Sequence, residues 1–258
     1  MNLLDTEYLL SVFLVFVRIS GILMVAPFFS QQTVSVRIRV LFAVVLAYAM
    51  TGLVADPLPD WILHTFGFMA ALGIEAVTGI LLGFTAQFIF YAVQFAGEII
   101  GFQMALGIAQ IYDPISGQNS NPVSNLLSLS FLLFFLLVDG HHIVLEALAT
   151  SFEVVPLGGA RLAASGPILL DWTSDFFMTA LRLAAPFMIT MFLIDITLGV
   201  FARLVPQANL FILSLPLKLM AGLTILLFFM QNLVPIVPSM VDDIARDLLR
   251  IIEALSVG

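Results

Sequence analysis

The sequence has no cysteine, a single lysine and three histidines in 258 residues, and only 10% of its residues are charged. Without cysteine the chain can form no disulfide, thiolate metal site or cysteine nucleophile. A typical soluble domain carries about 25% charged residues, so the low charge excludes an ordinary water-soluble enzyme. The net charge of −8 argues against nucleic acid as a partner, because nucleic acid requires a basic surface.

Enzyme motifs are missing as well. Lys218, the only lysine, follows no glycine-rich phosphate loop. The zinc-protease, Rossmann and nucleophile-elbow patterns are absent from the sequence. We therefore assign no catalytic, cofactor-binding or metal-binding residue, and we expect no enzyme activity and no cofactor. The D-G-H-H stretch ending at His142 could suggest a metal site, but adjacent histidines point to different sides of a helix. Capping or loop contacts are the favoured interpretation.

The chain instead has long apolar runs. They cover residues 8–29, 40–55, 176–204 and 209–237. A helix needs about 20 apolar residues to cross the hydrocarbon layer of a bilayer, and several runs reach that length. The sequence predicts an integral membrane protein, or a subunit that enters an assembly through the membrane.

Proline and polar clusters divide the N-terminal half. A first helix is predicted from about Asp5 to Ala26, where Pro27 ends it. A polar connection at 30–39 leads to a second helix, which ends at the prolines and aspartates of 55–60. Residues 61–112 contain few helix breakers. One straight helix of that length would measure about 78 Å, so this stretch must fold back or protrude from the bilayer.

Two G-x-x-x-G pairs lie in this long stretch, Gly79–Gly83 and Gly97–Gly101. Small residues at this spacing let helix backbones approach closely. Chance occurrence in an apolar sequence that contains glycine is the alternative.

The middle of the chain has no segment that suits a membrane crossing. Leu126–Val138 has only thirteen mostly apolar residues, and the segment after D-G-H-H carries Glu146 and Glu153. Backbone at membrane depth is tolerated only within helices or where protein or a water-filled cavity surrounds it. The middle third is therefore predicted to pack against other protein.

The C-terminal third predicts a helical hairpin and an amphipathic helix. After a loop at 156–167, the hairpin arms are Trp172–Leu204 and Asn209–Val234. The tail then places apolar residues on one helix face. The tail helix could lie at the membrane interface, dock on a partner or be a surface helix of this protein. Its apolar positions are Val241, Ile244, Leu248, Ile251 or Ile252, and Leu255.

Five ionisable residues interrupt the apolar runs. An ionisable residue within the membrane is a functional-site candidate and usually has a partner or faces a cavity. None of the five lies three or four residues from another, the spacing that brings helical neighbours together. Each must find its partner on another helix, on another subunit or in water, as in a proton-coupled transporter or a multi-subunit assembly. These candidates for buried polar contacts are Arg18, Glu75, Glu98, Arg182 and Asp195.

Several short stretches, taken in order, resemble the FliR family of flagellar export-gate proteins, whose counterparts in virulence secretion are the SctT proteins. The resemblance covers essentially the whole chain. It rests on G-F-Q-M at Gly101–Met104, Asp113–Pro114, N-P-V at Asn121–Val123, D-G-H-H, and the segments 36–43 and 206–223.

A second resemblance concerns the hairpin. Ala180–Leu223 is similar to the two-helix hairpin of FliQ, with Pro186, the Gln207–Ala208 pair, and Pro216 with Lys218 in matching order. The part before it would then be FliP-like. The resemblance implies an all-α, helical, membrane-associated export-gate subunit with three parts. These are a FliP-like part at 1–165 that includes a loop at about 101–123, a FliQ-like hairpin at 166–238, and an amphipathic C-terminal helix at 239–258.

The resemblance implies a core subunit of the type III, or flagellar, protein export gate. With FliP and FliQ it would form the pore through which unfolded flagellar subunits cross the bacterial inner membrane, at the flagellar basal body. FliP and FliQ would be its direct partners and FlhB and FlhA further ones. Unfolded exported flagellar proteins and membrane lipid would also contact it, and no cofactor is implied.

In the FliR family the loop in this position enters the lumen and helps to plug the closed pore. Apolar side chains that narrow a pore can close it by excluding water. An ordinary connecting loop is the alternative interpretation. Matched by position, the plug would comprise Gly107, Ile108, Ala109, Gln110, Ile111, Tyr112, Asp113 and Pro114.

Two other functions compete with the export gate. A secondary transporter for a small solute could use the intramembrane charges, although such folds usually show internal repeats. The two halves of this chain do not resemble each other, because the polar loop at 101–123 has no counterpart in the second half. A membrane structural subunit without a pore role is the third possibility.

Overall fold

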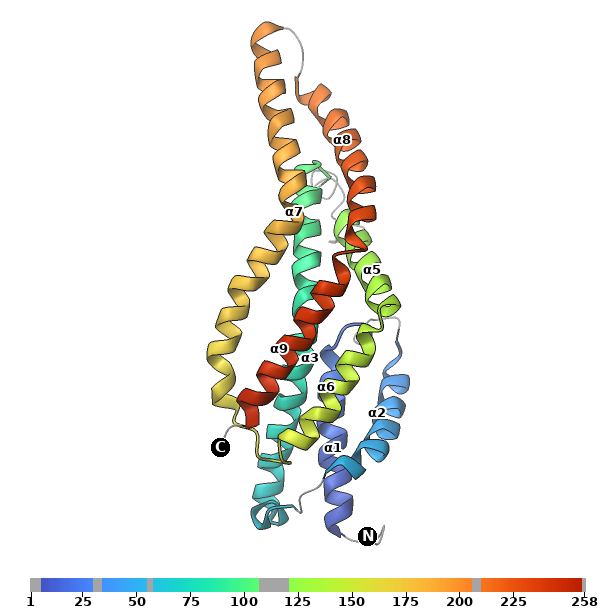
Figure 1. The fold of residues 1–258 in the computed structure, drawn as a ribbon, viewed down its shortest axis with the longest axis vertical. Coiled ribbons are helices and arrows are strands. Elements are labelled where there is room, and N and C mark those ends of the chain that lie inside the picture. Colours follow the sequence, from blue (N-terminus) through green and yellow to red (C-terminus); the bar gives the residue numbers. More distant parts are fainter. Residues whose placement is uncertain (1–5, 30–33, 55–57, 107–120, 206–209, 257–258) are drawn as a thin grey trace. The chain divides into compact units, whose positions relative to one another are not determined.

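A computed structural model describes residues 6–29, 34–54, 58–106, 121–205 and 210–256. All regular secondary structure in these residues is helical, which confirms the predicted all-α class (Figure 1). The α-helices are α1 (Thr6–Val25), α2 (Val36–Met50), α3 (Thr65–Gln103), α5 (Pro122–Leu137), α6 (Gly140–Val154), α7 (Ser165–Leu204), α8 (Leu210–Leu233) and α9 (Val237–Ser256). Three short 3-10 helices are η1 (Thr51–Leu53), η2 (Asp60–Leu63) and η3 (Leu162–Ala164).

The helices form two compact units. Unit 1 comprises Met1–Ile89, Asp139–Thr173 and Met240–Gly258, and unit 2 comprises Phe90–Val138 and Ser174–Ser239. The long helices α3 and α7 contribute residues to both units. The three-part division predicted from the FliP and FliQ resemblance concerns likeness to other subunits, and it stays a prediction.

In unit 1, α1 packs closely against the first half of α3. Gly79 of α3 is buried, and a Cβ atom placed there would overlap the carbonyl oxygen of Arg18 in α1. Gly83, one turn further on, faces the carbonyl oxygen of Ile22 in the same way. The first G-x-x-x-G pair therefore lies at a helix–helix contact, as its spacing predicted.

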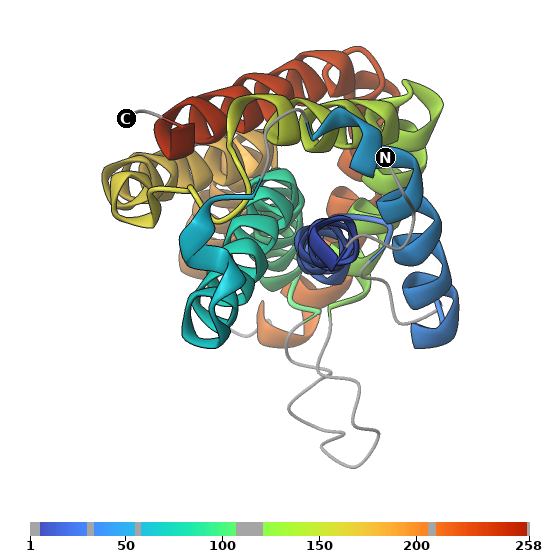
Figure 2. The same cartoon turned by 90° about the horizontal axis from the view of Figure 1, so that it is seen from below.

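Helix α9 covers unit 1 with its apolar face. Figures 1 and 2 show α9 running beside α6. The backbone N–H of Arg161 donates to the carbonyl oxygen of Leu255 at 3.0 Å, which fixes the end of the helix. Of the three interpretations of the tail, the structure shows a surface helix packed on its own chain. The predicted apolar positions are all buried: Val241, Ile244, Leu248, Ile251, Ile252 and Leu255.

In unit 2, the second half of α3 packs against α5. The ring of Phe90 meets the ring of Phe131 edge-on, with centroids 4.7 Å apart. Further along α3, a Cβ atom at Gly97 would overlap the backbone of Ser124, and the Ser124 hydroxyl donates to the carbonyl oxygen of Gln94 at 3.0 Å. The second G-x-x-x-G pair thus also marks a close helix contact.

Helices α7 and α8 form the predicted hairpin and run side by side in Figure 1. Within unit 2, the rings of Phe187 and Phe229 pack across it with centroids 5.4 Å apart. Helix α7 begins at Ser165, seven residues before the predicted Trp172. The segment was assigned to a loop because of its glycines and Pro167, but proline is tolerated in the first turn of a helix, whose N–H groups have no helical partner.

One other boundary differs from the prediction. Residues 36–39, predicted as part of a polar connection at 30–39, belong to α2, because the two arginines that follow Ser35 are good helix formers. The described part of the long stretch after residue 61 does not fold back and is long enough to protrude from a bilayer, the second of the two predicted alternatives. It is one helix of 39 residues, which at about 1.5 Å per residue measures roughly 58 Å.

Within the described residues, four helices are long and apolar enough to cross a membrane, or up to five if the broken pair α5 and α6 counts as one span. Helices α5 and α6 have only 16 and 15 residues, and α6 carries Glu146 and Glu153 on exposed positions. These features agree with the expectation that neither segment makes an independent span.

Two alanine substitutions in α3 test the close approach of α1. Gly79→Ala should lower the melting temperature, because the added Cβ forces the backbones of α1 and α3 apart. Gly73→Ala, in the same helix, meets no atom within 4 Å and should be neutral or stabilising by up to about 1 kcal/mol, since alanine favours helix. Thermal unfolding in detergent, followed by circular dichroism, measures both. Equal melting temperatures for the two variants would contradict the packing.

Candidate functional site

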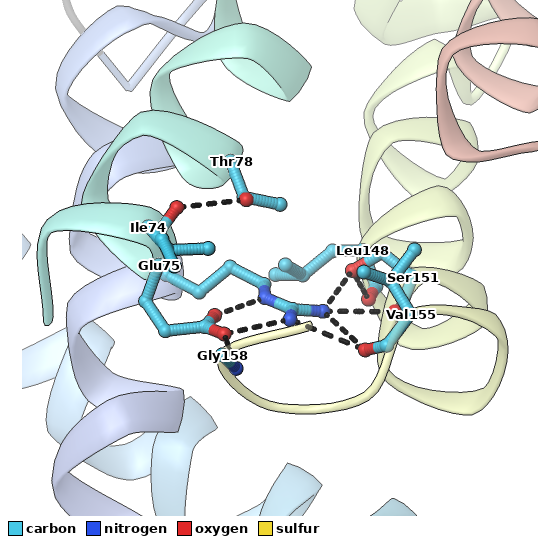
Figure 3. Close-up of polar contacts among 8 residues, drawn as sticks. Ile74, Glu75, Thr78, Leu148, Ser151, Val155 and Gly158 are labelled. Carbon is cyan, nitrogen blue, oxygen red and sulfur yellow. Dashed lines mark hydrogen bonds and ion pairs between the residues drawn. The ribbon is translucent and has the colours of Figure 1, made fainter. Parts of the chain in front are cut away.

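Arg18 of α1 and Glu75 of α3 form a fully buried ion pair at the centre of unit 1 (Figure 3). The Arg18 Nε donates to Glu75 Oε2 at 2.5 Å, and Arg18 Nη2 donates to Glu75 Oε1 at 3.0 Å. This two-bond geometry matches the planar guanidinium to the carboxylate. The pair joins two helices whose residues lie 57 positions apart in the sequence.

The remaining donors of Arg18 bind the end of α6. Nη1 donates to the carbonyl oxygens of Ser151 at 2.8 Å and Val155 at 3.3 Å, and Nη2 donates to the Val155 oxygen at 3.2 Å. The guanidinium carbon also lies 4.6 Å from the centre of the Phe152 ring. The Ser151 carbonyl oxygen also accepts the backbone N–H of Val155 at 3.0 Å, and carbonyls at the end of a helix carry the negative end of its dipole, which favours a nearby positive charge. Arg18 therefore supplies the C-terminal contacts of α6.

Glu75 in turn fixes the chain after α6. The backbone N–H of Gly158 donates to Glu75 Oε1 at 2.7 Å. Gly158 has a φ of 72°, a left-handed conformation that glycine adopts readily. A side chain there would also meet Trp61 and Ile62. Glycine at this position allows the loop to bring its N–H to the carboxylate.

The pair and its surroundings form a closed polar cluster. Burying an isolated charge is costly, but a buried pair whose other donors and acceptors are also satisfied offsets much of that cost. All three guanidinium nitrogens of Arg18 donate hydrogen bonds. The arrangement can hold α1, α3 and α6 in one geometry, and this is its physical role in unit 1.

Asp195 finds its partner across the hairpin. Lys218 Nζ of α8 lies 2.6 Å from Asp195 Oδ1 of α7 in unit 2. The Lys218 side chain is 19% exposed and that of Asp195 48%, so the pair is partly screened and holds the two arms in register only modestly. In the sequence, Lys218 stands out as the single lysine and as part of the FliQ-like run, and neither feature identifies Asp195 as its partner. Its place in the second apolar arm was the signal that it would pair with an acidic residue of the first.

Glu98 and Arg182 have neither an ion pair nor a hydrogen bond from their side chains in the part of the chain that the structure describes. Glu98 is half-buried in α3 and Arg182 is exposed on α7. Both belong to unit 2. Of the five ionisable candidates, the structure therefore joins Arg18 to Glu75 and Asp195 to Lys218, and it leaves these two available to groups outside the described residues.

A cavity of about 360 Å³ lies between α7 and α8 beside Arg182. Pro186 also lines it, and because proline has no N–H, the carbonyl oxygen of residue 182 lacks its usual helical donor. The other lining residues are mainly apolar. They are Leu183, Ile225, Phe228, Phe229, Asn232 and Ile236.

Asn121 clamps the start of α5 to α3. Its side chain caps α5 by accepting the N–H of Val123 at 3.0 Å, and Pro122 occupies the first turn. The Asn121 side chain lies directly over Gly101 of α3, where any Cβ atom would overlap it. The N-P-V stretch thus starts a helix and also fixes it beside α3.

The eight predicted plug residues lie outside the described residues. They are Gly107, Ile108, Ala109, Gln110, Ile111, Tyr112, Asp113 and Pro114. The described chain ends before them at Leu106 and resumes at Asn121.

Buried ion pairing, close glycine-mediated helix contacts and four helices long enough to cross a membrane define an all-α membrane protein. Residues 9–244 match the family model of bacterial export proteins, family 1. Over 241 residues, the chain is 31% identical to flagellar biosynthetic protein FliR of Escherichia coli (strain K12), covering 92% of this chain and 91% of that protein.

Other relatives agree. The chain is 31% identical over 249 residues to FliR of Bacillus subtilis (strain 168), covering 93% of this chain and 94% of that protein. It is 27% identical over 248 residues to FliR of Aquifex aeolicus (strain VF5), covering 96% and 94%. The chain belongs to the FliR family of bacterial export proteins.

Replacing one member of the buried pair should destabilise unit 1 strongly. Glu75→Gln leaves the Arg18 guanidinium buried without its counter-charge, which typically costs about 3–5 kcal/mol. Tryptophan fluorescence during thermal unfolding in detergent reports on unit 1, because both tryptophans, Trp61 and Trp172, belong to it. Asp243→Asn is the matched control, since Asp243 and its ion-pair partner Arg246 are 48% and 68% exposed. A Glu75→Gln melting temperature equal to that of the control would refute the role of the pair.

Proposed function

We propose that this chain is a core subunit of the flagellar protein export gate. Together with FliP and FliQ, it forms the pore through which unfolded flagellar subunits cross the bacterial inner membrane. It has no enzymatic role. The observation that carries the proposal is the family match over residues 9–244, in a chain whose helices form an all-α membrane protein.

The fixed ends of the loop support a plug at residues 107–114. Gly97 and Gly101 of α3 contact Ser124 and Asn121 of α5, so the chain leaves α3 and re-enters α5 at neighbouring positions of unit 2. A segment anchored in this way at both ends can project from the helix pair without disturbing its packing. Its position suits a structure that closes a pore and yields to a passing chain.

The residues of this segment suit closure of a narrow passage. Ile108 and Ile111 are apolar and can exclude water, and a constriction of that kind gates by dewetting. Gly107 and Pro114 flank them and disfavour a continuous helix. We propose the eight residues 107–114 as the plug of the closed channel.

Two features of unit 2 suit contact with neighbouring subunits. The hairpin α7–α8 exposes many large apolar side chains, among them Phe192, Leu193 and Leu227. Glu98 and Arg182 bring charges without partners in the described part of the chain. We propose that FliP and FliQ cover these faces directly. FlhB and FlhA are proposed as further partners. We also propose that the chain divides into a FliP-like part, a FliQ-like hairpin and the C-terminal helix.

Co-expression distinguishes the gate subunit from a small-solute transporter. A gate subunit should be recovered in low yield alone and in stable complexes when FliP and FliQ are present, because those subunits cover its apolar hairpin. The measurement is the yield of the monodisperse complex after size-exclusion chromatography. A chain that is stable alone as a monomer or homo-oligomer, and that does not bind FliP or FliQ, would favour the transporter.

Removing Ile108–Ile111 should make the assembled complex leaky to small ions, because the apolar constriction is lost. Single-channel conductance of complexes in planar bilayers measures this. Asn119→Ala, in the same loop but outside the plug, is the control, and its channel should stay closed.

In a second measurement, Ile108→Cys creates the only thiol of the chain and should crosslink to a stalled export substrate. Unchanged conductance together with crosslinks only to lipid would show an ordinary connecting loop.

A further inference from the structure

Three side chains with metal-ligand chemistry meet where α6 begins. Asp139 precedes the helix, and His141 and His142 lie in its first turn. One ligand atom from each of the three lies within 4.8 Å of the ligand atoms of the other two. We propose that Asp139, His141 and His142 bind a divalent transition-metal ion such as Zn²⁺. This inference is independent of the proposed function of the chain.

The sequence argument against such a site was that adjacent histidines point to different sides of a helix. The structure differs, because the two imidazole rings lie with their centroids only 4.2 Å apart. Both residues belong to the first turn, directly after a break in the chain direction at Asp139. Asp139 has a φ of 58°, a left-handed conformation, and its carboxylate oxygen lies 3.5 Å from Nδ1 of His142 in the first turn of α6.

The three side chains have few strong polar contacts among the described residues. The Nδ1 atom of His141 is buried and forms no hydrogen bond in the described part of the chain, and a buried polar atom without a partner is costly. Asp139 Oδ1 lies 3.5 Å from His142 Nδ1, which is longer than a good hydrogen bond. Asp139 makes no capping hydrogen bond from its side chain. A metal ion would satisfy all three groups together.

The geometry permits closure around an ion. The side chains of Asp139 and His142 are 71% and 68% exposed, so both can rotate freely. Zinc–nitrogen and zinc–carboxylate bonds are about 2.0–2.2 Å long, so an ion bound by all three side chains requires their ligand atoms, now within 4.8 Å of one another, to move closer together.

The ligand set selects the class of metal. Two imidazoles and one carboxylate suit zinc, copper or nickel, whereas magnesium and calcium prefer oxygen ligands alone. Three protein ligands leave a fourth position of a tetrahedral ion open to water or to a further ligand. A bound ion would stabilise the left-handed conformation of Asp139 and the first turn of α6, because it binds only the folded arrangement.

Titration of the purified full chain with Cu²⁺, without a histidine tag, tests the site. Electron paramagnetic resonance should show one bound Cu²⁺ per chain with nitrogen ligands, and Cu²⁺ should displace Zn²⁺ that was bound beforehand. His142→Gln and Asp139→Asn should each weaken binding by at least about tenfold, since even changes around the ligands of a metal cost that much. Asn at 139 tolerates the left-handed conformation. His64→Gln removes the remaining exposed histidine and should leave binding unchanged.

Two checks separate ligand loss from misfolding. Circular dichroism should be the same for His142→Gln and the unmodified chain. His142→Cys should restore Zn²⁺ binding and add a thiolate–metal absorption band with Co²⁺, because the chain has no other cysteine. The site is refuted if the unmodified chain binds no Cu²⁺, if His64→Gln abolishes binding as fully as His142→Gln does, or if His142→Cys shows no such band.

Discussion

A buried charge in an apolar chain needs a counter-charge beside it, and Arg18 and Glu75 supply this for each other. Their hydrogen bonds leave the two side chains almost no freedom to move. The guanidinium binds the carboxylate through two nitrogens and the end of α6 through two carbonyls. A shift of α1 along α3 by one turn would break these bonds at once. The pair therefore selects one register of α1, α3 and α6, which apolar side chains alone would specify less sharply.

The helix contacts differ in kind between the parts of this chain. Where α3 meets α1 and α5, glycines bring the backbones into contact, and such contacts stabilise helices in a membrane through close van der Waals packing. The hairpin α7–α8 is held together by Phe187, Phe229 and the pair Asp195–Lys218, yet much of its surface is apolar and exposed. The glycine-mediated contacts of α3 bury their surfaces within the chain. The hairpin α7–α8 suits a subunit whose exposed apolar surface is covered by other proteins or by lipid.

The structural features that could be predicted are those that depend on the spacing of residues within one helix. The apolar spacing of residues 241–255 identified the buried face of α9, and the G-x-x-x-G pairs identified two helix contacts. The partner of Arg18 was not predictable, because Glu75 lies 57 residues away and spacing is informative only within one helix. Gly158 looked like a loop glycine, and its hydrogen bond to Glu75 depends on the fold. The start of α7 was misplaced because a proline near a helix start resembles a loop in sequence. The plug residues 107–114 lie outside the described residues, so their role rests on the family resemblance.

The contact between Asn121 and Gly101 has a consequence for how this family can vary. With both ends of the intervening segment anchored side by side, its closure entropy grows only as the logarithm of its length, about 0.6 kcal/mol for each doubling. Insertions and deletions between these two residues therefore change the folding free energy of the helices very little. That segment is free to vary in length and composition, while the two anchoring residues stay under steric constraint.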